Sequence, residues 1–524
     1  MIRETLVNAL SRLENGLHME KSVAGLFSRK YLLLAQFYVI LVLAFFYVIP
    51  DTYFVLGASG LIFLLGLLLL LYRWLISILS QSTVLFWTFL FFLVLSTDWM
   101  YFKQITFTTH FFDLGSFMQP LYSTLYGHQL FTMNANPDTI ARIVSLNLTG
   151  PDSFFLFKYL FSPILFLLLP FYAVYPSALT LFIIQGAALG LPAFLAFRMV
   201  EDKGKALWIS LICLGYAPMY YALVFDFHTE AFYPLFILLV AYFLKRNTKL
   251  FYVSLLLFLS VNQAAPVLLF LFLPYIFWKT RSVKLVLYCS LMAAAFILAA
   301  YAFSGSVLGF QGTSLLSSTG GSGLVAKLTS SLPSKFNYVL YLLAPLLFIP
   351  LLEPLTILPA VGWLGYAFAS NYFPVLNIQF QYDLIIAGFC FVAFIGSSKR
   401  IDGRVVKVAL FVSLIVLAAT WGSAGGQLAA TDGPYSNPAY PKLNSILSQI
   451  PPTATVMASD DVFPHLASSM NTYFTPTFPP QWIVISKYDR NVGYQLPYIN
   501  HYLAVAKYTI IENDSILFVA ELST

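Results

Sequence analysis

The stretch FSPILFLLLPFYAVYPSALTLFIIQGAALGLPAFLAF, residues 161–197, contains no aspartate, glutamate, lysine or arginine. Roughly 20 helical residues cross the hydrocarbon core of a bilayer, so a stretch of this length and composition is typical of a membrane protein. The other residues share this character, because 59% of the 524 are hydrophobic and only 10% are charged. Soluble domains carry about a quarter charged residues. The sequence therefore predicts a polytopic α-helical membrane protein.

Apolar runs recur along most of the chain and define its domain organisation. We expect them near residues 31–49, 53–72, 83–102, 154–175, 177–198, 206–224, 231–244, 250–264, 266–278, 284–304, 336–352, 355–372, 384–396 and 405–422. Several of these runs are short, so they need tilt or help from flanking residues to span a bilayer. Together they predict about 13 transmembrane helices within a transmembrane domain of residues 31–422.

Basic residues indicate the orientation of these helices. They gather in clusters at residues 1–30, Arg198/Lys203/Lys205, Lys245/Arg246/Lys249, Lys279/Arg281/Lys284 and Lys399/Arg400/Arg404/Lys407. Cytoplasmic loops are enriched in lysine and arginine, so we place all five clusters on the cytoplasmic side. Residues 1–30 then form a cytoplasmic segment of a multi-pass cell-membrane protein, and its C-terminal domain is external.

This assignment requires that the run 154–175 does not cross the membrane as a plain span. Its Lys158, Pro163 and Pro170 suit a re-entrant helix or one on the membrane surface. An external loop of residues 103–153 follows from the same count of crossings. The glycosylation sequons at Asn147 and Asn513 both fall in segments predicted to be external.

The last hundred residues have a different pattern. Residues 423–524 contain short apolar runs such as QWIVISKY, and a candidate hairpin turns at Asn513-Asp514. We expect a small external α/β domain there. The net charge of +6 is explained by the basic clusters and does not indicate nucleic-acid binding. The three cysteines lie in apolar runs, which favours a packing role over a disulfide or a metal site.

The polar segment FDLGSFMQPLYSTLYGHQLF, residues 112–131, follows the third apolar run and contains Asp113. One interpretation is that Asp113 caps the next helix. The other is that this carboxylate faces a cavity at the outer membrane surface and acts as a catalytic base. Gln119, His128 and Arg142 in the same external loop are candidate substrate-binding residues.

A second polar cluster, FDFHTEAFYPLF, occupies residues 225–236 between two apolar runs. Asp226, His228 and Glu230 alternate along it and share a face if the backbone is extended. Carboxylates with an imidazole suit Mg²⁺ or Mn²⁺, so this cluster is a candidate metal-binding or phosphate-binding site. The alternative is a polar hairpin tip with Glu230 in the first turn of the next helix.

A third patch, NIQFQYDLI at residues 377–385, has a similar alternation of polar and apolar side chains. Gln381 and Asp383 are candidate substrate-binding residues at the edge of the same cavity. The patch is equally consistent with an ordinary loop at the membrane interface.

The motifs quoted so far, together with IPPTATVMASDDVFPHLAS in the tail, resemble a membrane family called domain of unknown function 2079. The resemblance covers residues 100–480. One departure is SVNQAAP, residues 260–266, where relatives often carry a charged, acidic motif that Asn262 and Gln263 do not supply. Two additional apolar runs also precede the family-like region.

That family in turn resembles the membrane-embedded glycosyltransferases of the C type. This resemblance implies transfer of a sugar from a polyprenyl-phosphate donor to an acceptor at the external membrane face. It also implies that Asp113 on the first external loop acts as the base, and that Asp226 and Glu230 on a later loop assist, sometimes through a divalent metal. The implied partner is a membrane lipid or a polyprenyl-phosphate-linked substrate.

Two other functions fit the same sequence. One is a transporter or flippase of lipid-linked or amphipathic molecules, and the other is a non-catalytic membrane scaffold whose tail binds partners. Charged residues deep within the spans would favour transport, and Glu353 is the clearest candidate. The sequence leaves the sugar, the acceptor and the oligomeric state open.

Overall fold

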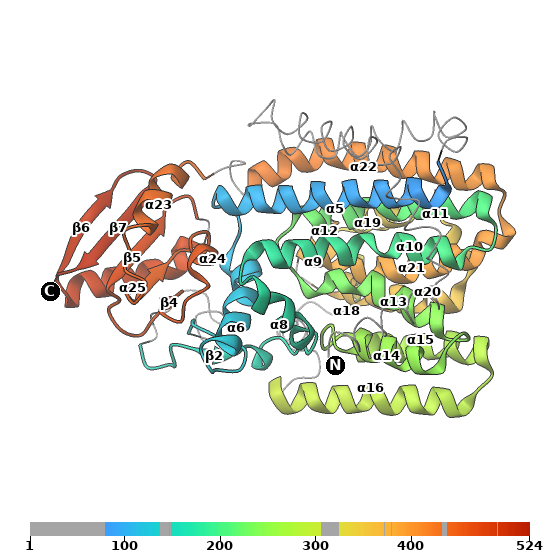
Figure 1. Ribbon diagram of the computed structural model, residues 1–524, viewed down its shortest axis with the longest axis horizontal. Helices are drawn as coiled ribbons and strands as arrows, with labels where there is room; N and C mark the ends of the chain where they lie inside the picture. The colour runs from blue at the N-terminus through green and yellow to red at the C-terminus, as the bar shows by residue number, and fades with distance from the viewer. Residues whose placement is uncertain are drawn as a thin grey trace, which may run out of the picture.

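The computed structural model describes residues 79–136, 146, 148–304, 324–370, 373–378, 380–431, 437–489 and 491–523. The predicted apolar runs at 31–49 and 53–72, and Arg142, lie outside the described residues. Figure 1 shows two parts side by side, a large bundle of helices and a smaller part with a β-sheet that ends the chain.

The described part of the bundle consists mainly of α-helices. Its main helices are α5 (Gln81–Ile105), α6 (Ser116–Leu125), α8 (Leu165–Val174), α9 (Ala178–Gly190), α10 (Pro192–Met199), α11 (Lys203–Gly215), α12 (Ala217–Val224), α13 (Tyr233–Phe243), α14 (Thr248–Leu259), α15 (Ala265–Thr280), α16 (Val283–Ser304), α18 (Leu324–Thr329), α19 (Leu332–Leu343), α20 (Pro354–Ala369), α21 (Leu384–Ser397) and α22 (Gly403–Thr431). Three short turns matter for the site, namely the π-helical turn η2 (Phe111–Gly115) and the 3₁₀ turns η4 (Thr229–Phe232) and η8 (Gln381–Asp383).

Within the described residues, four helical segments are long and apolar enough to cross a membrane. They are Gln81–Ile105, Ala178–Met199, Val283–Ser304 and Gln381–Arg400. Further apolar helices of 10–17 residues accompany them, which agrees with the short runs in the sequence. The predicted run 206–224 is not one helix, because the chain breaks between α11 and α12 at Tyr216, and Pro218 lies in the first turn of α12.

Helix α21 lies at the centre of the bundle. Every residue from Leu384 to Ile395 is buried, as expected for a helix that is apolar on all sides. It contacts α13, α20 and α12. A Cβ atom at Gly388 would lie 2.6 Å from Ile237 Cδ1, so this glycine permits the close approach of α21 and α13. Cys213, Cys289 and Cys390 are all buried and free, which confirms their predicted packing role.

The segment predicted to be re-entrant contains the short strand β2 (Phe154–Phe155), the 3₁₀ turn η3 (Leu156–Lys158) and the α8 helix. The α8 helix has 10 residues, so its length is about 15 Å, half the thickness of a bilayer core. Helices α13 and α14 are of similar length, so the re-entrant course of residues 154–175 stays a prediction.

The chain ends in the predicted α/β domain. Its sheet has the order β4-β3-β5-β7-β6, with β3 (Val456–Ala458) parallel to β4 (Thr472–Tyr473) and to β5 (Trp482–Ser486). The strands β6 (Tyr508–Asn513) and β7 (Leu517–Leu522) form the predicted antiparallel hairpin. The helices of this domain are α23 (Tyr440–Leu447), α24 (Phe463–Leu466) and α25 (Val492–Val505). Because α22 continues to Thr431, the predicted domain boundary at 423 falls inside a helix.

The C-terminal domain packs against the segment that follows α5. The buried Gln119 side chain of α6 donates from Nε2 to the carbonyls of Ser469 and Thr472, at 3.0 and 2.9 Å. The His465 ring stacks on Phe107 with 3.6 Å between ring centroids. Burial lowers the pKa of His465 to about 3, so this ring is neutral and structural. The domain is therefore joined to the bundle by both polar and aromatic contacts.

Two of the basic clusters meet at the other end of the bundle. Lys399 forms an ion pair with Glu201 at 2.7 Å, and Lys205 Nζ donates to the carbonyl of Ser398 at 3.1 Å. These contacts lie at the far end of α21 from η8 and from the C-terminal domain (Figure 1). The distribution of basic residues and the fold therefore both place these two connections on the same side of the bundle.

This arrangement predicts the accessibility of single cysteines introduced into a variant that lacks Cys213, Cys289 and Cys390. Ser515→Cys, exposed on the C-terminal hairpin, should react with a membrane-impermeant maleimide in intact cells. Thr248→Cys, exposed within the Lys245–Lys249 connection, should react only after permeabilisation. The opposite labelling pattern would show that the orientation is the reverse of the predicted one and that the C-terminal domain is cytoplasmic.

Candidate functional site

Asp113 lies in the π-helical turn η2, which begins at Phe111 and leads directly into α6. The N-cap residues of η2 and α6 are His110 and Gly115, so Asp113 occupies neither N-cap position. The capping interpretation of Asp113 is therefore wrong. A carboxylate in the first turn of a helical segment is stabilised by the aligned backbone dipoles, and π-helical turns are frequent at functional sites.

The side chain of Asp113 meets His228 from the second polar cluster. Asp113 Oδ1 lies 3.1 Å from His228 Nε2, and the two side chains are 17% and 10% exposed. The His228 Nδ1 atom lies 3.0 Å from the carbonyl oxygen of Asp226, which can only accept a hydrogen bond. This contact places a proton on Nδ1 and directs Nε2 at the carboxylate. The two external-loop motifs predicted from the sequence therefore converge through one imidazole.

The environment of His228 favours its charged form. Burial lowers the pKa of the imidazole, but the hydrogen bond and the negative charge of Asp113 act in the opposite direction and leave the pKa above its usual value of 6.5. The backbone N–H of His228 donates to Gln185 Oε1 at 2.8 Å, and its ring contacts the rings of Phe117 and Phe225. These contacts hold the ring in place against Asp113.

Asp226 is buried beside this pair, and its negative charge is compensated by Lys103. Its Oδ1 atom accepts from Lys103 Nζ at 2.7 Å, and its Oδ2 atom accepts from the backbone N–H of His110 at 2.7 Å. Lys103 is in the last turn of α5, where a cation is favoured by the helix dipole. The sequence analysis did not identify Lys103, although it is the one basic residue of α5 and lies at the end of that helix.

Glu230 is hydrogen-bonded to a different segment from the other two residues of its cluster, although its negative charge also helps to raise the pKa of His228. The backbone is extended at His228 and becomes a 3₁₀ turn at Thr229, so the alternating side chains no longer share a face. Glu230 Oε1 accepts from Asn262 Nδ2 at 2.9 Å, and Asn262 Oδ1 in turn accepts from the Tyr233 hydroxyl at 2.6 Å. Gln263 Oε1 accepts from the backbone N–H of Phe161 at 2.8 Å. The amides of SVNQAAP thus fix Glu230 and the backbone at Phe161.

The donor set does not fit the expected metal ion. Asp226 faces an ammonium group, His228 faces Asp113 and Glu230 faces an amide. In the part of the chain that the structure describes, no group of three His, Cys, Asp or Glu side chains could hold a metal. The geometry therefore gives the expectation of Mg²⁺ or Mn²⁺ no support.

Gln381 and Asp383 lie in η8, which contacts both α12 and η4. The ring of Phe380 packs on that of Phe225 with 5.3 Å between centroids, so the third polar patch borders the second. Gln381 and Asp383 are buried, at 5% and 0% exposure. Both Asp383 oxygens and Gln381 Oε1 lack a hydrogen-bond partner among the described residues.

The remaining predicted substrate-binding residues lie elsewhere. The side-chain amide of Gln119 donates from Nε2 to the C-terminal domain, and its Oε1 atom accepts from the backbone N–H of Asn134 at 2.7 Å. His128 is exposed in the turn after α6, at a positive φ of 53°. The structure brings neither of them to the Asp113–His228 pair.

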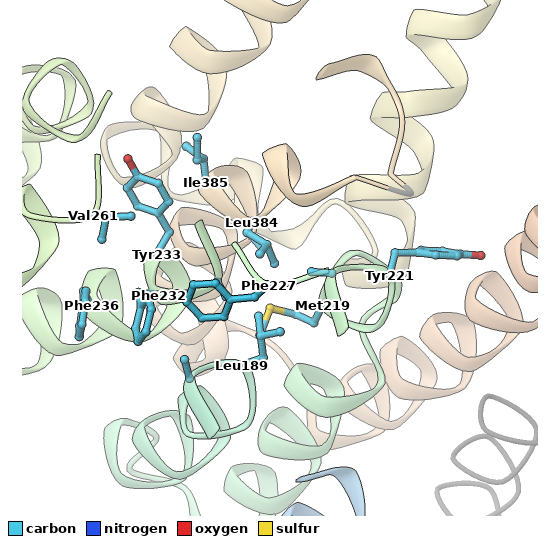
Figure 2. Close-up of a cluster of buried hydrophobic side chains, with 14 of the residues drawn as sticks. Leu189, Met219, Tyr221, Phe227, Phe232, Tyr233, Phe236, Val261, Leu384 and Ile385 are labelled. Carbon is cyan, nitrogen blue, oxygen red and sulfur yellow. The ribbon is translucent and has the colours of Figure 1, made fainter. Parts of the chain in front are cut away.

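An apolar cluster supports the polar residues of the hairpin. Figure 2 shows Phe227 and Phe232 among the side chains of Leu189, Met219 and Leu384, all buried. Phe227 thus packs into the bundle while Asp226 and His228, on either side of it, contact residues of the first loop. Rigid packing of this kind is what a catalytic constellation needs to keep its geometry.

Comparisons with known proteins identify the region that carries this site. A family model described as "Predicted membrane protein (DUF2079)" matches residues 103–491. No curated protein matches the sequence. Among solved structures, ArnT from Cupriavidus metallidurans bound to undecaprenyl phosphate is 11% identical, with a TM-score of 0.43, covering 82% of this chain and 97% of that one. The apo state of the same ArnT gives 10% identity, a TM-score of 0.41 and coverages of 78% and 93%. Similarity this low does not carry an activity from ArnT to this chain.

The raised pKa of His228 predicts a pH-dependent contribution to stability. A histidine whose pKa is higher in the folded than in the unfolded state stabilises the fold fully below its unfolded pKa of about 6.5. That contribution is lost as the pH rises through the folded pKa. The thermal midpoint of Asp113→Asn in detergent should therefore lie furthest below that of the wild type at pH values below about 6.5, and should approach it as the pH rises through the raised pKa of His228.

Glu201→Gln is the matched control, because it removes a carboxylate from an exposed ion pair at the other end of the bundle. It should change the midpoint little at any pH. A difference in thermal midpoint between Asp113→Asn and the wild type that stays constant from about pH 6 to pH 9 would show that Asp113 does not stabilise the charged form of His228.

Proposed function

Because a family model matches most of its length, this chain belongs to the DUF2079 family of predicted membrane proteins, and from that premise we propose that it is a membrane glycosyltransferase. In this proposal it transfers a sugar from a polyprenyl-phosphate donor to a hydroxyl group of an acceptor at the external membrane face. The observation that carries the proposal is the hydrogen-bonded pair of Asp113 and His228.

The pair provides the acid–base chemistry that such a transfer requires. Asp113 takes the proton from the acceptor hydroxyl as that oxygen attacks the anomeric carbon of the sugar. A new C–O bond forms to the acceptor, the C–O bond to the phosphate breaks, and polyprenyl phosphate leaves with the bonding electrons. His228 orients the carboxylate and stabilises its charge, as a hydrogen-bonded partner does in other catalytic pairs.

The surroundings of the pair suit a donor whose tail stays in lipid. Asp113 lies just beyond α5, one of the four helical segments long enough to span a membrane. The choice of a polyprenyl-phosphate donor rests on the resemblance of the family to C-type glycosyltransferases.

Replacing Asp113 with asparagine tests the catalytic role. The substitution keeps the size of the side chain but removes its basicity, and general-base catalysis typically contributes a factor of about 10²–10⁴. Turnover of a polyprenyl-phosphate-linked sugar by the reconstituted protein should fall by roughly that factor. The amount of folded protein should remain near that of the wild type.

Glu201→Gln serves as a matched control, because it removes a carboxylate from an exposed ion pair at the other end of the bundle. In the proposal, turnover by Glu201→Gln stays near that of the wild type, whereas turnover by Asp113→Asn falls. Full activity of Asp113→Asn in the same assay would show that Asp113 is not the base and would contradict the proposed reaction.

A transporter is the second candidate, and Asp383 is the observation that favours it. This carboxylate is fully buried at the start of α21, and neither of its oxygens has a partner among the described residues. Carboxylates inside membrane bundles often mark substrate or proton pathways. Glu353, the residue suggested by the sequence, is instead paired with Arg400 at 2.6 Å near the other end of α21.

The two candidates make different predictions for Asp383→Asn. In the glycosyltransferase proposal this variant keeps its catalytic base, so turnover stays within about tenfold of the wild type. In a transporter it abolishes movement of the lipid-linked substrate across proteoliposome membranes, while Asp113→Asn does not. Substrate movement that requires Asp383 without any sugar transfer would establish transport as the function.

A further inference from the structure

The turn that carries Asp113 is held from the side opposite His228 by the C-terminal domain. Asp460 follows β3 and is completely buried. Its backbone carbonyl accepts from the N–H of Phe111 at 2.7 Å, and its Oδ1 atom accepts from the N–H of Phe112 at 3.2 Å. The two backbone amides that precede Asp113 are therefore fixed by one residue almost 350 positions further along the chain.

His110 extends this connection to the other loop. Its Nδ1 atom lies 3.2 Å from Asp460 Oδ2, while its backbone N–H donates to Asp226 Oδ2 at 2.7 Å. The N-cap residue of the turn is thus held between a carboxylate of the C-terminal domain and a carboxylate of the 225–236 hairpin. The hairpin carboxylate is itself bound to Lys103, so the contacts form one continuous network.

Asp460 is fixed within its own domain. Its N–H donates to Asp489 Oδ2 at 2.7 Å, and its Oδ2 atom accepts from Asn491 Nδ2 at 2.6 Å. Asp489 Oδ1 accepts from the N–H of Asn491 at 2.7 Å. Asp460 and Asp489 follow the parallel strands β3 and β5, so the sheet sets the position of the carboxylate that reaches the turn.

Aromatic packing closes the same interface. The Phe111 ring stacks on Phe474 with 4.7 Å between centroids and meets Phe463 edge-on at 4.4 Å. A Cβ atom at Gly115 would lie 3.0 Å from Phe463 Cδ1, so a larger residue here would require the Phe463 ring to move. The turn and the domain are therefore shaped to fit one another.

We propose that Asp460 is a positioning residue for Asp113, so that the C-terminal domain completes the site on the bundle. Asp460 does not touch the reacting atoms and acts through the backbone of residues 110–112. The effect on catalysis rests on the proposed function of Asp113, whereas the restraint on the turn stands on the contacts alone. A displacement of about 1 Å in a catalytic group can cost roughly 10²-fold in rate, so such a restraint has a measurable effect.

Hydrogen exchange of the full chain in detergent tests the restraint without any assay of activity. Asp460→Ala removes the acceptor of the Phe112 amide, so exchange in a peptide covering residues 110–115 should accelerate by at least about tenfold. Asp460→Asn keeps an oxygen for Phe112 but removes the charge opposite His110, and it should give an intermediate effect. Asp514→Asn, a carboxylate at the C-terminal hairpin, is the control and should leave this peptide unchanged.

Kinetics test whether the restraint acts through Asp113. Asp460→Ala should lower kcat by about 10²-fold with little change in KM. The double variant with Asp113→Asn should be no slower than Asp113→Asn alone, because the base that Asp460 positions is already absent. Additive losses would show a general structural role and overturn the proposal.

If the wild type transfers no sugar, hydrogen exchange alone tests whether Asp460 restrains the turn. Unchanged exchange of residues 110–115 in a folded Asp460→Ala protein overturns the proposal whatever the activity. Accelerated exchange together with an inactive wild type supports the restraint and refutes the proposed function. If Asp460→Ala does not fold, Asp460→Asn provides the same comparison.

Discussion

The buried carboxylate of Asp226 is the constraint on which the rest of the site depends. A charge removed from water at the edge of a membrane domain must be compensated, or it destabilises the fold by several kcal/mol. Lys103 from α5 and the backbone N–H of His110 provide this compensation. By satisfying one charge, the chain joins the end of α5, the first polar loop and the 225–236 hairpin.

Beyond Asp226, hydrogen bonds of backbone groups position the site as much as hydrogen bonds between side chains do. The carbonyl of Asp226 orients the imidazole of His228, and the imidazole meets Asp113. On the opposite side, Asp460 holds the turn from which Asp113 projects. The pair of side chains is thus the meeting point of three segments, two in the bundle and one in the C-terminal domain, and none of them forms the site alone.

The sequence predicted the parts whose signals are local. Polar residues stand out in an apolar chain, so Asp113 and the 225–236 cluster were identified, and the strand pattern of the tail predicted its α/β domain. The partners Lys103 and Asp460 were missed because they lie 123 and 348 positions from the groups they bind. Glu230 was misplaced because alternation shares a face only in extended backbone, and the chain turns into a 3₁₀ helix at Thr229. Asn262 and Gln263, interpreted as a departure from the family pattern, proved to be structural supports.

The central claim is that Asp113 and His228, from two distant loops, form one interacting pair. A double-mutant cycle tests it most directly, with Asp113→Asn, His228→Gln and their combination compared by unfolding of the purified protein near pH 6. The account predicts a coupling free energy of about 0.5–3 kcal/mol, as found for residues in direct contact. Additive effects of the two substitutions on the free energy of unfolding would show that the side chains do not interact and would contradict the account.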